Sequence, residues 1–282
     1  MWPPPAVVAP APPATWPPSW YPDPWEPGTV RWWDGHAWTG HTARPAVAPP
    51  EPFRPLPVVA AWLGLVVTAG ALVGARLGLE LLGRFDWPIV VYAALVALLG
   101  YGPMVAYCWW ACRRWGTGSL AEDVGARVRW VDLGWGPLVW ISAWVGGIAA
   151  AIVVYALHVP LKSNTDGIDR YAGDRGVLIA FLIVAVVVGP LVEELMFRGV
   201  VMRGLASIAP VWMAVAGQGL CFGAAHVDPV RGWGNLGLVL VLGSVGAVFG
   251  GAAYLLRRIG PTVIAHALYN AVVMVIVLTV HP

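Results

Sequence analysis

The chain has 282 residues, of which 59% are hydrophobic and only 11% are charged, and its mean hydropathy is +0.70. About a quarter of the residues in a soluble domain are charged, so this composition excludes an ordinary soluble globular protein. The formal net charge of +2 gives no reason to expect a nucleic-acid partner, and the three cysteines form neither a disulfide framework nor a zinc pattern.

The first 55 residues are not membrane-like. Residues 1–18 are rich in proline and alanine and have neither a basic start nor an apolar core, so we expect a disordered tail rather than a signal peptide. Residues 44–55 are a second stretch rich in proline and alanine, which is typical of a linker.

Between these two stretches, residues 19–43 are rich in tryptophan. Asp34-Gly35 is typical of a hairpin turn and predicts strands at Val30–Trp33 and Ala37–Thr42. The stretch resembles a short tryptophan-rich module of uncharacterised role found at the ends of many bacterial membrane proteins. The resemblance is carried by Trp20, Tyr21, Pro22, Asp23, Pro24, Trp32, Trp33, Asp34, Gly35, Trp38 and Thr39. The aromatic residues could serve only as a small core, or they could bind a ligand.

From Leu56 onward the chain consists of uncharged apolar runs, each close to the roughly 20 residues that a membrane-spanning helix needs. The runs are Leu56–Ala75, Pro88–Cys112, Leu133–Leu157, Gly176–Val192, Gly204–Ala225, Gly232–Leu256 and Ile259–Val280. We therefore predict an all-α, polytopic bundle of about seven spans, with three spans and their loops in residues 56–175 and a four-span core in 176–282. The fifth helix could begin late, near Ala209-Pro210.

Basic residues near the ends of spans predict the orientation. They gather in the connections after the second, fourth and sixth runs, at Arg113, Arg114, Arg127, Arg129, Arg203, Arg257 and Arg258. We assign these connections to the cytoplasm. This assignment places the N-terminus in the cytoplasm and the C-terminus outside, in the plasma membrane of a bacterium-like cell.

The fourth run leads into the sequence GPLVEELMFRG at residues 189–199, which places three charged side chains among apolar ones. An ionised side chain at membrane depth costs roughly 2.5–3.5 kcal/mol, so Glu193, Glu194 and Arg198 suggest a functional site. On a helix, Glu194 and Arg198 share a face and can pair, whereas Glu193 points about 100° away and is the freer acid.

Two further polar patterns interrupt the later runs. Phe222 and His226 lie four residues apart near the end of the fifth run, and His266 and Asn270 lie four residues apart in the seventh. Helix geometry places His266 and Asn270 on one face. At about 1.5 Å of rise per residue, and with ordinary helix tilt, the acids and both histidines can meet at one depth in the membrane.

The three elements E-E-x-x-x-R, F-x-x-x-H and H-x-x-x-N resemble the signature of the CAAX-protease and bacteriocin-processing family of intramembrane proteases. That family includes the type II prenyl-protein endopeptidase. Pro190, Phe197 and Gly199 fit its usual surroundings, and the resemblance covers about Val177 to Val280. It implies a helical membrane bundle that cleaves peptide bonds.

The resemblance also implies roles for individual residues. Glu193 and His226 would activate a water molecule, while His266 and Asn270 would stabilise the oxyanion. These residue types suit hydrolysis, which needs a base for the water and donors for the developing negative charge. Arg198 would neutralise and orient Glu194, and Phe222 is more simply explained as core.

A metal site is the competing chemistry. Glu193, His226 and His266 supply three nitrogen or oxygen ligands, the number that an open catalytic zinc site uses. The family is often labelled a metalloprotease, but the water-activating arrangement needs no metal, and we slightly favour a site without one.

The candidate catalytic residues are therefore Glu193, Glu194, Arg198, His226, His266 and Asn270. The expected partners are the lipid bilayer and a peptide or protein substrate in or near the membrane. Two other functions stay open. One is a non-enzymatic immunity factor or scaffold with the same fold, and the other is a proton-coupled transporter that uses the carboxylates as a relay. The spans show no obvious internal repeat, which counts against the transporter.

Overall fold

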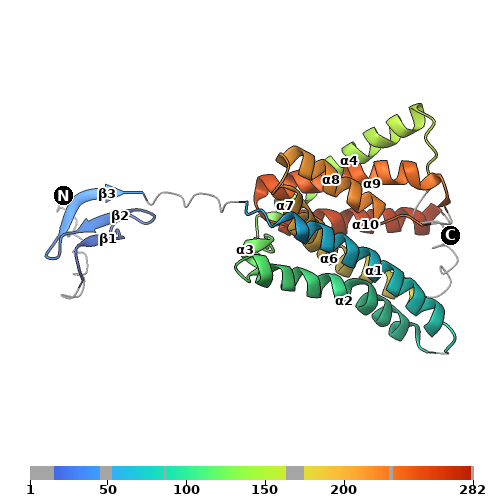
Figure 1. Ribbon diagram of the computed structural model, residues 1–282. Coiled ribbons are helices and arrows are strands. Elements are labelled where there is room, and N and C mark those ends of the chain that lie inside the picture. Colours follow the sequence, from blue (N-terminus) through green and yellow to red (C-terminus); the bar gives the residue numbers. More distant parts are fainter. Residues whose placement is uncertain (1–15, 45–52, 86, 163–174, 229–230, 281–282) are drawn as a thin grey trace. The chain divides into compact units, whose positions relative to one another are not determined.

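The computed structural model describes residues 16–44, 53–85, 87–162, 175–228 and 231–280 (Figure 1). The chain divides into two compact units, residues 1–52 and 53–282. Most of the predicted disordered tail at 1–18 and of the predicted linker at 44–55 lies outside the described residues.

The N-terminal unit contains a small antiparallel sheet with the strand order β1-β2-β3. Its strands are β1 (Ser19–Pro22), β2 (Val30–Trp33) and β3 (Trp38–Ala43). The predicted hairpin is confirmed, with its second strand shifted by one residue, whereas the sequence did not indicate β1 as a strand. Gly35 has a φ of +97°, and the Asp34 carboxylate accepts hydrogen bonds from the two backbone N–H groups at His36 and Ala37. This turn needs the glycine because a side chain rarely adopts that φ.

Tryptophan rings form the core of this sheet. Trp33 is buried, and the Trp38 ring meets it edge to face with 5.4 Å between centroids. Asp23 links β1 to β2 through an ion pair of 2.9 Å with Arg31. Burial would raise the pKa of Asp23, but hydrogen bonds from the Trp25 and Glu26 backbone and from Arg31 hold the pKa below its usual value.

The second unit is a helical bundle, and six segments in its described residues are long and apolar enough to cross a membrane. They are α1 (Val58–Leu82), α2 (Ile89–Trp115), α4 (Asp132–Ala156), the composite α5–α7 segment (Arg175–Leu205), α9 (Gly234–Leu256) and α10 (Gly260–Val280). In such helices every backbone polar group finds its partner within the segment, as a lipid environment requires. A short helix, α3 (Leu120–Asp123), lies in the connection after α2.

The expected fifth span is a shorter helix than its apolar run suggested. This helix, α8, covers only Val211–Ala224, because Pro210 precedes it as its N-cap and residues 206–209 form a turn after Leu205. The late start near Ala209-Pro210 is therefore confirmed. Where about seven spans were expected, the described residues contain six helices of spanning length and one shorter apolar helix.

The composite segment is not a uniform α-helix. Two π-helical stretches, η2 (Val184–Val188) and η3 (Leu195–Val201), flank the short α-helix α6 (Gly189–Glu194), and α7 (Met202–Leu205) follows. A π-helical turn is wider than an α-helical one and is frequent at functional sites. The acidic pair therefore lies on a short regular helix between two widened stretches.

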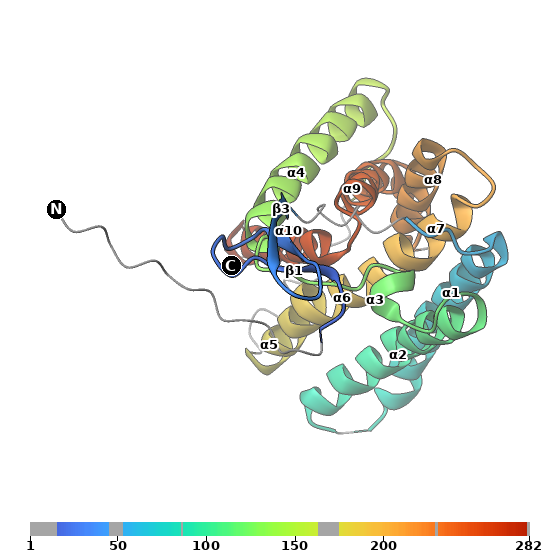
Figure 2. The same cartoon turned by 90° about the vertical axis from the view of Figure 1, so that its left-hand side faces the viewer.

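This segment occupies the middle of the bundle. One side consists of the packed pair α1 and α2, and the other consists of α4, α8, α9 and α10, among which α9 packs on both α4 and α8 (Figures 1 and 2). The η3 stretch contacts α1, α2, α8 and α9, while α6 contacts α2 and α10. Side chains from both sides can therefore reach the acidic pair.

Glycines allow α8 and α9 to approach closely. A Cβ atom on Gly219 would lie 2.8 Å from the backbone nitrogen of Ala247, and one on Gly223 would lie 3.0 Å from that of Gly243. Small residues at such crossings are the usual means of helix packing in membranes. The close crossing brings the end of α8, which His226 follows by two residues, against α9.

Candidate active site

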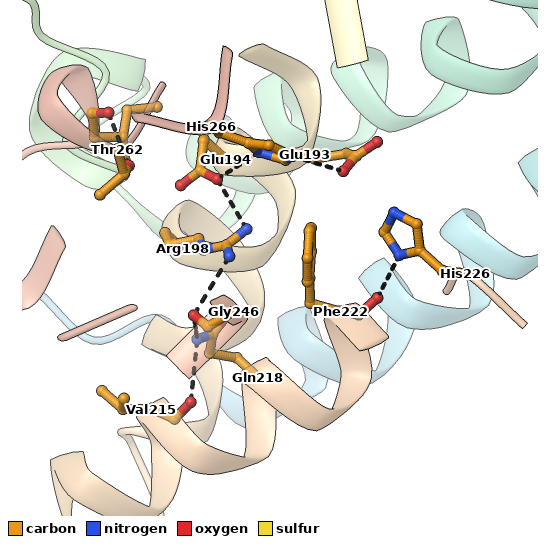
Figure 3. A network of polar contacts seen from close by, with 11 residues as sticks. Glu193, Glu194, Arg198, Val215, Gln218, Phe222, His226, Gly246, Thr262 and His266 are labelled. Atoms are coloured by element: carbon orange, nitrogen blue, oxygen red, sulfur yellow. Dashed lines mark hydrogen bonds and ion pairs between the residues drawn. The ribbon is translucent and has the colours of Figure 1, made fainter. Parts of the chain in front are cut away.

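Glu194 and Arg198 form the buried centre of the site. Their i,i+4 spacing yields an ion pair of 3.0 Å between Glu194 Oε1 and Arg198 Nη1, and both side chains are fully buried. The guanidinium also donates from Nη2 to the Gly246 carbonyl of α9 at 3.3 Å and lies 4.5 Å from the centre of the Phe222 ring. The predicted pairing is present, and it ties the composite segment to α8 and α9 (Figure 3).

Gln218 is a member of this network that the sequence analysis did not identify. Its Nε2 donates to the Gly246 carbonyl at 2.7 Å, so Gly246 accepts from both Gln218 and Arg198. The sequence does contain an indication of this role, because Gln218 is a polar residue inside the apolar run at 204–225, and such residues usually form a hydrogen bond to another helix. The structure shows that its side chain is fully buried.

His266 joins α10 to both acids. Its Nδ1 lies 3.0 Å from Glu194 Oε1, and its Nε2 lies 3.9 Å from Glu193 Oε2. A carboxylate that is paired with arginine can only accept a hydrogen bond, so the network assigns a proton to Nδ1. The second ring nitrogen then faces Glu193.

Glu193 differs from its neighbour in its partners. Its Oε1 accepts a hydrogen bond of 3.2 Å from the Tyr101 hydroxyl of α2, and its Oε2 has no hydrogen-bond partner within the described part of the chain. The two adjacent acids thus point to different surroundings, as the 100° offset along a helix predicts. Tyr101 did not stand out in the sequence, since a tyrosine in a membrane span is ordinary.

His226 lies just beyond the end of α8. Its Nδ1 donates to the Phe222 carbonyl at 2.8 Å, which leaves Nε2 for other contacts. The Phe222 ring lies 4.8 Å from the His226 ring and 5.5 Å from the His266 ring, so one phenylalanine packs against both imidazoles (Figure 3). No hydrogen bond or ion pair joins His226 to Glu193 in the described residues.

Asn235 fixes the loop that follows His226. Its side-chain amide donates to the Asp228 carbonyl at 2.7 Å and its side-chain oxygen accepts from the Asp228 backbone N–H at 3.1 Å. The two bonds hold the loop against the start of α9 and thereby limit where His226 can lie.

Asn270 lies one turn after His266 on α10. Its Nδ2 donates to the Ala185 carbonyl in the widened η2 stretch at 2.7 Å. An amide nitrogen carries two protons, so a second donor stays available on the same atom. The bond holds the amide toward the segment that carries the acids.

A cavity of about 320 Å³ connects these groups. Its wall includes His226, His266, Asn270 and Phe222, together with apolar side chains of α9. The structure therefore brings both histidines and the asparagine to one cavity, and it places Glu193 Oε2 3.9 Å from His266 Nε2. Glu194 and Arg198 are fully buried, and each contacts a residue of the cavity wall: Glu194 contacts His266, and Arg198 lies against the Phe222 ring.

The three proposed metal ligands do not form a metal site in this arrangement. Within the described residues, no three histidine, cysteine, aspartate or glutamate side chains are placed to hold one ion. The Phe222 ring packs against both histidines. We therefore derive no step of the chemistry through a metal.

Comparisons with known proteins agree with the geometry. Residues 175–272 match the family model described as type II CAAX prenyl endopeptidase Rce1-like, and residues 18–51 match that of a protein of unknown function, DUF2510. No curated protein and no solved structure gave a significant match. The first match begins at the start of α5, ends within α10 and includes all six candidate catalytic residues. The match of residues 175–272 supports an Rce1-like domain of the CAAX-protease and bacteriocin-processing type within this chain, and its six apolar helices indicate an integral membrane protein.

Proposed function

We propose that the protein is an intramembrane endopeptidase that hydrolyses a peptide bond in or near the bilayer. The observation that carries the proposal is that His226, His266 and Asn270 line one cavity, while Glu193 Oε2 lies 3.9 Å from His266 Nε2. Glu193 Oε2 is buried without a hydrogen-bond partner in the described residues, so it can accept a proton from a bound water molecule.

In the first step, water attacks the carbonyl carbon of the scissile bond. The water gives one proton to Glu193, and His226, which is held through Nδ1, accepts a hydrogen bond at Nε2 from the remaining O–H of that water. The carbonyl oxygen becomes an oxyanion. The second amide proton of Asn270 and a proton on His266 Nε2 are the donors for it, with Glu194 as the counter-ion of the imidazole.

In the second step, the carbon–nitrogen bond breaks. The proton held by Glu193 passes to the leaving amine, and the carbonyl carbon keeps the water oxygen as a new carboxyl group. Glu193 returns to its starting state, so the cycle needs no other reactant. We place this reaction in the plasma membrane of a bacterium-like cell, with the N-terminus in the cytoplasm.

The test is cleavage of a fluorogenic membrane-peptide library by the purified protein in detergent. Loss of the base in Glu193→Gln should lower kcat about 100-fold to 10,000-fold, and His226→Ala should also reduce it strongly. Two controls change the same residue types elsewhere: Glu80→Gln, in an exposed pair with Arg76, and His41→Ala, in the small sheet. Full cleavage by both site variants would refute the assignment.

The same assay tests the metal question. We expect a strong zinc chelator to leave the rate unchanged, because the proposed reaction uses only the side chains described above. Loss of activity with the chelator and recovery with added zinc would require a metal-assisted mechanism instead. If the wild-type protein cleaves no peptide, the non-enzymatic scaffold becomes the better interpretation.

A further inference from the structure

Tyr101 links the acidic pair to a helix outside the family match. It lies in α2, which ends at Trp115, whereas the matched region begins at residue 175. Its ring faces an apolar groove of about 700 Å³, which it lines together with Val188 and Val192. Its hydroxyl group donates a hydrogen bond of 3.2 Å to Glu193 Oε1.

The hydrogen bond distinguishes the two oxygens of Glu193. Oε1 is held by Tyr101, and Oε2 is left without a hydrogen-bond partner in the described residues while it faces His266 Nε2 at 3.9 Å. A carboxylate held at one oxygen cannot turn freely about its last bond. The oxygen that can accept a proton is therefore directed toward His266, which lines the cavity.

Gly189 makes room for this contact. A Cβ atom at this position would lie 2.9 Å from the Tyr101 hydroxyl oxygen and 3.4 Å from Glu193 Oε1. A methyl group there would displace the hydroxyl, so the bond depends on a glycine one turn before the acid. Three residues from two helices thus fit together around one carboxylate oxygen.

We propose that Tyr101 is a positioning residue for Glu193, which it holds so that Oε2 faces His266 of the catalytic cavity. The inference rests on the proposed function, since it assigns Tyr101 to the same reaction. It also gives α2, which lies outside the matched domain, a direct part in the site. Misplacement of a reacting group by about 1 Å can cost 100-fold in rate, which sets the scale of the expected effect.

The principal test is Tyr101→Phe, which removes only the hydroxyl. We expect kcat to fall about 10-fold to 100-fold while KM stays within twofold, because the substrate cavity is unchanged. A role in folding alone would instead lower the yield or the melting temperature and leave kcat per folded molecule the same. A second variant with 4-aminophenylalanine at position 101 keeps a donor there and should recover most of the lost rate.

Tyr107→Phe is the matched control. Tyr107 lies on the same helix, and its hydroxyl donates to the Ala60 carbonyl at 2.7 Å. It makes no hydrogen bond to Glu193 in the described residues. Its loss should leave kcat unchanged. If Tyr101→Phe keeps the wild-type kcat, or if the 4-aminophenylalanine variant is as slow as Tyr101→Phe, the inference is overturned.

Glu193→Gln separates this inference from the proposed function. If Glu193→Gln is inactive and Tyr101→Phe is fully active, only the role of Tyr101 fails. If Glu193→Gln keeps the wild-type rate, or the wild-type protein cleaves no peptide, the proposed function fails and the role of Tyr101 fails with it.

Discussion

The buried pair of Glu194 and Arg198 gives the strongest prediction about stability. Arg198→Met replaces the guanidinium with an apolar group and leaves a fully buried carboxylate without its cation. Removal of one partner of a buried ion pair costs about 3–5 kcal/mol, because the other charge stays buried and uncompensated. For a unit the size of residues 53–282, each kcal/mol corresponds to about 2–4 °C in Tm. We therefore expect Tm to fall by about 6–20 °C.

Differential scanning fluorimetry in one detergent measures this fall, and the chain contains its own control. Arg76 and Glu80 form a pair with the same i,i+4 spacing at 3.3 Å, but their side chains are 58% and 61% exposed. Exposed pairs contribute about 0–1 kcal/mol, so Arg76→Met should change Tm by no more than a few degrees. Equal shifts for the two variants would refute the argument from burial.

A double variant separates charge from packing. Glu194→Gln combined with Arg198→Met removes both charges, so it should be more stable than Arg198→Met alone. Its activity should stay low, because His266 Nδ1 then bonds a neutral amide instead of a carboxylate. A double variant no more stable than Arg198→Met would show that lost packing, rather than an uncompensated charge, causes the destabilisation.

Two further predictions concern helix packing and the small sheet. Gly219→Ala should lower Tm by several degrees, because its Cβ would lie 2.8 Å from the Ala247 backbone nitrogen, whereas Gly251→Ala, which meets nothing within 4 Å, should leave Tm unchanged. The folded-state pKa of Asp23 lies below 3.8, so its contribution to stability is present above that pH and is lost as the pH falls through the folded pKa. The indole signals of the sheet, followed by NMR in the full chain, should therefore change at acid pH, and Asp23→Asn should remove that part of the dependence.

The sequence predicted the helices well, and it singled out the polar side chains within them, because both features depend on composition. Long uncharged runs must form helices in lipid, and rare charges within them stand out. The pairing of Glu194 with Arg198 followed from their spacing alone. The direct contact of His266 with both acids did not follow, because it depends on how α10 packs against α6.

Other features left no signal in the sequence. The π-helical stretches η2 and η3 cannot be read from periodicity, since nearly every residue in them is apolar. Arg258 looked like a residue that sets the orientation, yet it forms an ion pair of 2.5 Å with the fully buried Asp132 at the start of α4. A charge that sets the orientation and one that stabilises a helix junction have the same appearance in a sequence, and only the packing of the helices distinguishes them.

The two adjacent acids have different roles in the proposed site, because their side chains contact different partners. Glu194 is bonded to both a guanidinium and an imidazole, so its charge is fully compensated and is poorly suited to take a proton. Glu193 has a neutral phenol on one oxygen and an unbonded second oxygen beside His266. A short α-helix between two widened stretches keeps the acids about 100° apart, so that one faces the cation and the other faces α2. The consecutive glutamates are therefore not interchangeable: Glu194→Gln should alter stability and the state of His266, whereas Glu193→Gln should remove the base.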